Sequence, residues 1–407
     1  MSNLNYPFEP VAHEDWVLQI HKELRGQTEQ IEFKDSIEEL ELNITEVPSH
    51  LLTISSPSES NEVNSVHFER IVNEKESNRR ILLALMQGAN ALFIRMEKER
   101  VDWKLVFDQI ELAYIRTEIL MQGEAQISEL RTQLTKEQLS HIVLLSDELR
   151  DQNRSTCIPY FNGFELQQIG ANAQQELSLI ATAYHHYLSE GNRSEVVFSV
   201  GVGSQYFVQM AKIRALHYLI QKIAALHGIA HPAYRIQAHI GWTNKSLKDP
   251  YTNLLRQTSE AMSAYAGGVQ GLVIHPWDEY AFEGKEDFTL RMSLNVYNLL
   301  NDEAHFDWVQ DPMKGSRIVE ALTIQLIEKT WSRIQSLSEL DRNEMIETVL
   351  VDIDQTRTKR ADAWLNGKEQ LIGVHTYLNN DESKAKSWGA VPSYLGKEYL
   401  TAERTLK

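Results

Sequence analysis

The chain has 407 residues, of which 42% are apolar and 24% are charged, enough for one large hydrophobic core with appendages. Its formal net charge of −17 repels phosphate backbones and anionic lipid, which argues against nucleic acid or a membrane surface as the main partner. The single cysteine, Cys157, excludes an internal disulfide and any multi-cysteine zinc or iron–sulfur site.

The sequence shows no targeting segment. No apolar run reaches the roughly 18 residues that a transmembrane helix needs. The first ten residues, MSNLNYPFEP, lack the basic start and apolar stretch of a signal peptide. We therefore expect a soluble, cytoplasmic protein.

Residues 1–70 read as an arm or linker that contacts a partner. An amphipathic piece from Asp15 to Arg25 carries Trp16, Ile20 and Leu24 at helical spacing. An acidic stretch and the Ser- and Asn-rich run SSPSESNEVNS follow it. This composition cannot build a core alone, so we expect the arm to lie across the body or across another chain.

Residues 71–340 alternate between short apolar runs and helix-length segments. Strands are predicted at 91–95, 155–161, 196–203, 234–240 and 271–276, and helices from Ala173 to Ser189, Tyr206 to His227, Asn253 to Tyr265 and Ser316 to Leu337. Strands without polar alternation, separated by helices, are typical of a parallel sheet covered on both faces. Residues 110–115 and 306–310 are weaker strand candidates.

The size of this region favours a closed (β/α)8 TIM barrel, an α/β fold, with a doubly wound open sheet as the alternative that periodicity leaves open. Residues 341–407 form a helical, charged extension. It ends in SWGAVPSYLGKEYL, whose aromatic residues Trp388, Tyr394 and Tyr399 need a surface to pack on.

Barrel sites form at the carboxyl ends of the strands, which makes Glu165, His239, and His275 with Asp278 and Glu279 candidates. Such a histidine serves as a proton donor, a metal ligand or an orienting group, but a buried histidine satisfied by a carbonyl is the commoner case. The GVGSQ segment at 201–205 follows a strand and opens a helix, as a phosphate loop would, yet it lacks the third glycine of the dinucleotide motif. We expect no metal site.

Four stretches resemble the substrate-binding barrel of the cobalamin-dependent acyl-CoA mutases, and of the methylmalonyl-CoA mutase family in particular. They are FNGFELQQIGANAQQEL (161–177), GSQYFVQMAKIRAL (203–216), residues 238–272 with HPWDE (275–279), and DPMKGSRIVEALT (311–323). The run Asp249-Pro250-Tyr251, with Asn253, Arg256 and Gly267-Gly268 behind it, carries most of the resemblance. It implies a TIM barrel.

The departures from the family pattern fall at its active-site positions. Phe164-Glu165 stand where the family has an aromatic-His pair, and a carboxylate accepts hydrogen bonds where a histidine would donate one. Glu195 and Val197 stand where the family has its coenzyme A-binding Arg-x-Ser, which reverses the sign of the charge. Trp242 lies in a segment that forms a small polar wall in the family.

Other family features have no counterpart in this sequence. The segments that supply the radical-gating tyrosine and the carboxylate-binding arginine are absent, as are the Asp-x-His-x-x-Gly motif and the flavodoxin-like cobalamin domain. The resemblance therefore implies a non-catalytic small subunit of a heterodimeric mutase. Its partner would be a large catalytic subunit that holds adenosylcobalamin and interconverts succinyl-CoA and (R)-methylmalonyl-CoA.

Two alternatives remain at this point. The chain is the barrel half of a split mutase whose cobalamin domain lies on another chain, or it is a barrel recruited to bind something else, unless side chains have filled its lumen. We expect one set of residues at the barrel mouth and, in the small-subunit reading, no catalytic role for any of them: Phe164, Glu165, His239, Trp242, Gln270 and Glu279.

Overall fold

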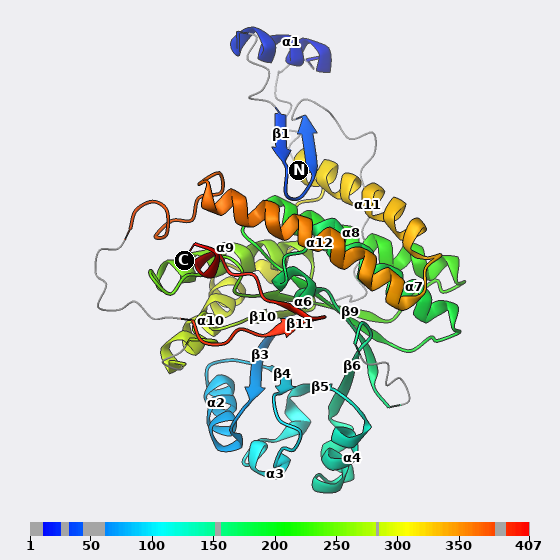
Figure 1. Ribbon diagram of the computed structural model, residues 1–407, viewed down its shortest axis with the longest axis vertical. Coiled ribbons are helices and arrows are strands. Elements are labelled where there is room, and N and C mark those ends of the chain that lie inside the picture. The colour runs from blue at the N-terminus through cyan, green and yellow to red at the C-terminus, as the bar shows by residue number, and fades with distance from the viewer. Residues whose placement is uncertain are drawn as a thin grey trace, which may run out of the picture.

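The computed structural model describes residues 11–25, 32–43, 62–150, 156–281, 285–378 and 388–406. Within these residues, eight parallel strands close into a barrel, in the order β10-β3-β4-β5-β6-β7-β8-β9 (Figure 1). The strands are β3 (Asn64–Ile71), β4 (Ala91–Met96), β5 (Arg116–Met121), β6 (Ile142–Asp147), β7 (Ile158–Asn162), β8 (Val196–Gly201), β9 (Tyr234–Ile240) and β10 (Gly271–Ile274).

Pairing of the last strand with the first closes the barrel. Gly271 and Leu272 of β10 lie opposite Asn64 and Ser65 of β3. An open doubly wound sheet would leave both of these strands as edges. The predicted (β/α)8 barrel is therefore confirmed, and the open-sheet alternative is wrong.

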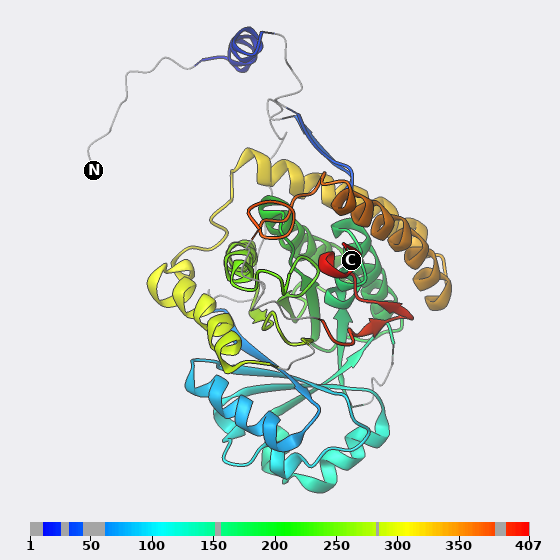
Figure 2. The same ribbon diagram turned by 60° about the vertical axis from the view of Figure 1, so that its left-hand side comes forward.

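Helices cover the barrel on its outside, and Figure 2 shows the longest of them grouped on one side. In the part of the chain that the structure describes, no helix is long and apolar enough to cross a membrane. The barrel helices are α2 (Glu74–Met86), α3 (Trp103–Val106), α4 (Glu124–Gln133), α5 (Lys136–Ser140), α6 (Gly163–Gln168), α7 (Ala173–Ser189), α8 (Tyr206–Leu226), α9 (Thr252–Gly267), α10 (Asp287–Asn298) and α11 (Arg317–Leu337).

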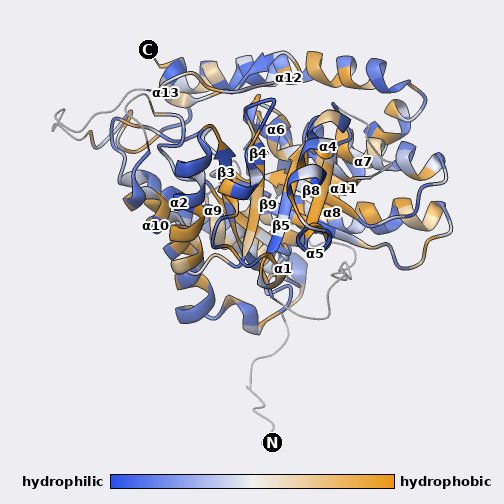
Figure 3. Ribbon diagram, turned by 90° about the horizontal axis from the view of Figure 1, so that it is seen from below, coloured by the Kyte–Doolittle hydropathy of each residue, from blue (hydrophilic) through white to orange (hydrophobic). Residues whose placement is uncertain are grey.

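Two apolar layers account for the core. One lies between the strands and the helices, and Figure 3 shows the barrel strands surrounded by helices that carry both apolar and polar stretches. The other is formed by side chains of opposite strand parity, which face the lumen. These lumen residues are Val66, Phe68, Ala91, Phe93, Leu120, Leu145, Tyr160, Val197 and Val273. The lumen of this barrel is thus filled by its own side chains.

Three barrel strands were not predicted, and two predicted strands are wrong. β3, β5 and β6 carry polar residues such as His67, Glu69 and Glu118, which are buried and satisfied by ion pairs that a sequence does not display. Residues 112–114 and 306–308 form 3₁₀ turns instead of strands. Their aromatic residues Tyr114 and Trp308 are exposed, so apolar character there did not indicate burial.

The amino-terminal part consists of α1 (His13–Glu23) and a hairpin of β1 (Glu32–Asp35) and β2 (Leu40–Asn43), which project from the barrel (Figure 1). No residue of α1 is buried. The hairpin turn does touch the barrel, because Ile37 accepts a hydrogen bond from Asn172 at 3.0 Å. The first barrel strand begins at Asn64, earlier than the predicted boundary near residue 70, and most of the Ser- and Asn-rich run lies outside the described residues.

The carboxyl-terminal part begins with α12 (Arg342–Leu365), which packs on α7. It ends in β11 (Ser393–Tyr394), β12 (Lys397–Glu398) and α13 (Ala402–Thr405). No second α/β domain follows the barrel within the described residues. We call residues 388–406 the tail.

Candidate functional site at the mouth of the barrel

Glu165 is the centre of the barrel mouth. It lies in the first turn of α6, directly after β7, where the Asn162 side chain caps the helix by accepting a hydrogen bond from the Glu165 amide. Arg95, at the end of β4, places Nη1 2.5 Å from Glu165 Oε1. Tyr399 of the tail donates its hydroxyl to Glu165 Oε2. Both carboxylate oxygens are therefore engaged by partners from this chain.

Two buried histidines lie side by side against Phe164. His239 Nδ1 and His275 Nε2 are 3.1 Å apart, and the ring of Phe164 stacks on both, with centroids 4.7 Å from His239 and 5.0 Å from His275. Burial lowers the pKa of His239 to about 3 and that of His275 well below its usual value. Both rings are therefore neutral at physiological pH and cannot act there as cationic acids.

Trp242 forms one wall of the mouth. Its indole Nε1 donates to the carbonyl of Pro276 at 3.0 Å, and its ring contacts His275 and Tyr280, with centroids 4.5 and 4.6 Å away. Tyr399 stacks above it with an interplanar angle of 19°. This aromatic layer occupies space that a small polar wall would leave open.

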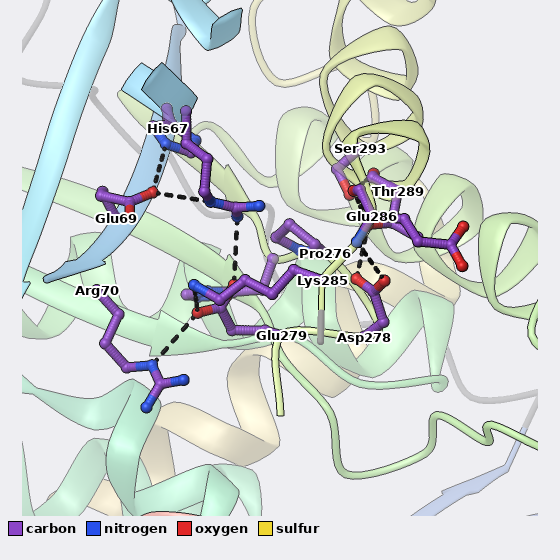
Figure 4. Close-up of polar contacts among 12 residues, drawn as sticks. His67, Glu69, Arg70, Pro276, Asp278, Glu279, Lys285, Glu286, Thr289 and Ser293 are labelled. Atoms are coloured by element: carbon purple, nitrogen blue, oxygen red, sulfur yellow. Dashed lines mark hydrogen bonds and ion pairs between the residues drawn. The ribbon is translucent and has the colours of Figure 1, made fainter. Parts of the chain in front are cut away.

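Glu279 is surrounded by three cations (Figure 4). Arg70 Nε lies 3.3 Å away, Arg80 Nη2 3.5 Å and Lys285 Nζ 2.6 Å. Arg80 also bonds Glu69 at 3.3 Å, so the network ties β3 and α2 to the loop after β10. Such a carboxylate holds elements together, and its oxygens have no need of a ligand.

The tail covers this whole arrangement. Tyr394 donates its hydroxyl to Asp147 at the end of β6, with oxygen–oxygen distances of 3.0 and 3.1 Å. Leu400 N donates to Gln168 O at 2.7 Å. Burial raises the pKa of Asp147 to about 6. The tail aromatics predicted to need a surface therefore bury themselves on the barrel of their own chain.

The structure brings five of the predicted mouth residues together, namely Phe164, Glu165, His239, Trp242 and Glu279. The placement of Gln270 at the mouth is wrong. Gln270 precedes β10, and its Oε1 accepts from the amide of Ile236 near the start of β9, so it lies at the opposite end of the barrel. Its position directly before the predicted strand at 271–276 already indicated the amino-terminal end of that strand, and only the family resemblance suggested the mouth.

The two residues at the coenzyme A positions also lie away from the mouth. Glu195 precedes β8, and its carboxylate is 4.0 Å from the guanidinium of Arg116. Val197 faces the filled lumen. Sequence reasoning missed Arg95, Asp147 and the tail tyrosines as mouth residues, although the aromatic spacing of the tail was a usable signal.

No described group of three or more His, Cys, Asp or Glu side chains is arranged to hold a metal ion. Cys157 is buried, and burial raises the pKa of its thiol. Among the mouth residues described above, His239 Nε2, His275 Nδ1 and the Tyr280 hydroxyl have no hydrogen-bond partner.

Comparison with known proteins assigns the family. The sequence profile described as methylmalonyl-CoA mutase matches residues 156–397, more than half of the chain. The chain belongs to the methylmalonyl-CoA mutase family. This family includes curated proteins named as small and as large subunits.

The similarity to individual members of the methylmalonyl-CoA mutase family is moderate. The methylmalonyl-CoA mutase small subunit of Porphyromonas gingivalis is 30% identical over 203 residues, which cover 48% of this chain and 33% of that protein. The methylmalonyl-CoA mutase of Cereibacter sphaeroides is 30% identical over 242 residues, covering 54% of this chain and 34% of that protein. The chain thus spans about a third of the length of the curated relatives it matches.

Among solved structures, Plasmodium falciparum HPPK-DHPS gives a TM-score of 0.36 at 11% identity, over 59% of this chain and 49% of that one. A score of this size carries no argument about fold or function.

Proposed function

We propose that this chain is the non-catalytic small subunit of a heterodimeric methylmalonyl-CoA mutase. Its large subunit would hold adenosylcobalamin and isomerise succinyl-CoA and (R)-methylmalonyl-CoA. The observation that carries this proposal is the closure of the barrel mouth by the tail. Glu165, in the position of the family's catalytic histidine, is held by Arg95 and Tyr399 of the same chain.

The filled lumen of the barrel also supports a non-catalytic role for this chain. An acyl-CoA that threads a barrel needs an open axis and groups to hold its charged ends. Here Phe68, Phe93, Tyr160 and Val197 fill the axis. At the amino-terminal end, the carboxylate of Glu195 stands where the family has an arginine.

The residues at the mouth do not fit a corrin ring. Trp242, Tyr280 and Tyr399 lie where a flat ligand would have to approach, and each is buried against the others. The tail backbone is anchored on both sides of them, through Gly389 N to Tyr280 O at 2.8 Å and Leu400 N to Gln168 O at 2.7 Å. We therefore derive no step through the cofactor on this chain.

The surface that meets the large subunit is proposed to include α1. This helix has eleven residues and buries none of them, and isolated helices of that length are marginal in water. Val11 and Leu18 are exposed at this end of the chain. The tail aromatics, which the sequence predicted to need a surface, pack on the barrel of their own chain instead.

Calorimetric titration of the purified full chain with succinyl-CoA tests the proposal against the split-enzyme alternative. We expect no saturable heat, because the lumen and the mouth are occupied. Micromolar binding would favour the barrel half of a split mutase and contradict the proposal. The matched control is the large subunit, which should bind the same acyl-CoA.

A further inference from the structure

A polar cavity of about 270 Å³ lies beside the barrel mouth, outside the site described above. It is bounded by the loop 203–205 after β8, the first turns of α7 and α8, the β1–β2 turn and the end of α12. The loop belongs to the GVGSQ segment, which the proposed function does not use. Segments far apart in the chain therefore converge on one cavity that opens to solvent.

Two buried ion pairs line the cavity. Lys212 Nζ lies 2.8 Å from Glu176 Oε2, and Arg360 Nη2 lies 3.1 Å from Glu38 Oε1. All four side chains are buried. Within each pair the charges compensate each other, so neither pair by itself calls for a charged ligand.

Apart from these two ion pairs, the lining carries one negative group and one site of partial positive charge. The carboxylate of Glu369 forms no ion pair among the described residues, and burial raises its pKa, although the nearby Arg360 and a hydrogen bond with Trp364 lower it. The amino terminus of α8 carries the partial positive charge of a helix start, and its N-cap residue, Gln205, provides no side-chain cap. A cavity with one surplus of each sign favours a ligand that carries both charges.

Two buried polar atoms in the lining also lack partners. They are Gln209 Oε1, in the first turn of α8, and Thr243 Oγ1, after β9. Gln209 is 5% exposed and Thr243 is 6% exposed. Buried polar atoms in native proteins are nearly always hydrogen-bonded, so two unmet atoms in one cavity point to a missing partner.

We propose that this cavity binds a small zwitterion of the α-amino acid type. The loop 203–205 at the amino terminus of α8, which lines the cavity, receives its carboxylate. Glu369 and Gln209 receive its ammonium group, and Thr243 donates or accepts one further hydrogen bond. The site is built by this chain alone, so the inference stands independently of the mutase partnership.

Calorimetric titration of the full chain with the proteinogenic L-amino acids, one at a time, tests the inference. We expect at least one to bind saturably with 1:1 stoichiometry. For that amino acid, the analogue without the ammonium group and the analogue without the carboxylate should each bind at least about tenfold more weakly, since each loses a charge-assisted contact. If no amino acid binds, or if an analogue with one charge binds as tightly, the inference is overturned.

Two near-isosteric variants place the binding in this cavity. Gln209→Leu and Thr243→Val each remove one unmet polar atom, and each should weaken binding about tenfold. Gln221→Leu, on the same helix but outside the cavity lining, is the matched control and should bind as the wild type does. Unchanged affinity in a folded Gln209→Leu or Thr243→Val protein would contradict the assignment.

Discussion

The hydroxyl of Tyr399 donates to the carboxylate of Glu165, which joins the tail to the mouth of the barrel. Arg95 holds the other carboxylate oxygen at 2.5 Å, so a single buried acid ties together β4, α6 and the tail. A residue type that looks like a lost catalytic group is thus a structural anchor. Loss of any of these contacts should therefore lower the free energy of unfolding.

Loss of the Tyr399 hydroxyl should destabilise the fold. Tyr399→Phe leaves one oxygen of a buried carboxylate without its donor, which costs about 1.5–3 kcal/mol. Urea unfolding followed by tryptophan fluorescence measures this change. Tyr377→Phe is the control, because Tyr377 is 84% exposed and its substitution should leave the free energy of unfolding unchanged. Equal stabilities of the two variants would show that the tail does not close the mouth.

Removal of either partner of the Glu165–Arg95 pair should cost more. Glu165→Gln leaves the Arg95 guanidinium without its counter-charge, a change of about 3–5 kcal/mol for a buried pair. Arg95→Met should be comparably destabilising. The double variant should lose clearly less than the sum of the two, because each single change strands a charge that the other removes. Additive losses in a double-mutant cycle would argue against direct coupling.

Asp147 gives the stability a pH dependence of known sign. Burial raises its pKa from the usual 3.8 to about 6 in the folded chain. A raised carboxyl pKa favours folding when the group is protonated, so its contribution is fully present below about pH 3.8 and lost as the pH rises through about 6. The loss amounts to about 3 kcal/mol. Between pH 4 and 7, the wild type should lose this much relative to Asp147→Asn in urea unfolding, and parallel curves would refute it.

Deletion of residues 1–25 should separate folding from assembly. Since α1 buries no residue, the truncated barrel should unfold within about 1 kcal/mol of the full chain. Its complex with the large subunit should weaken. The deletion must stop before the hairpin, because Glu38 in the hairpin turn is bonded to Arg360 and to the amide of Ala173. Unchanged affinity for the large subunit would remove α1 from the interface.

The sequence predicted the bounds of a helix or strand correctly where its apolar residues recur at regular spacing. α7 begins and ends at the predicted residues, and β9 coincides with its prediction, because their apolar periodicity is uninterrupted. β3 was not predicted, because His67 and Glu69 interrupt its apolar run. Both side chains are buried and bonded to each other. Arg80, on α2, donates a further hydrogen bond to the carboxylate of Glu69.

The candidate site was predictable only in part for a similar reason. Residues that follow a strand, such as Glu165 and Trp242, could be placed at the mouth from the order of elements alone. The same order places Gln270 before the strand at 271–276 and therefore at the opposite end, so its assignment to the mouth, which came from the family resemblance, was avoidable. The contacts of Tyr394 and Tyr399 join residues more than 230 positions apart, and no local pattern encodes such pairs.

The central claim is that this chain is a subunit whose chemistry lies in its partner. Its most direct test is co-expression with the methylmalonyl-CoA mutase large subunit from the same genome, followed by size-exclusion chromatography with light scattering and a mutase assay. We expect a 1:1 complex whose activity is unchanged by Tyr399→Phe in this chain. A chain that elutes alone, or a complex whose turnover falls with that variant while assembly persists, would contradict it.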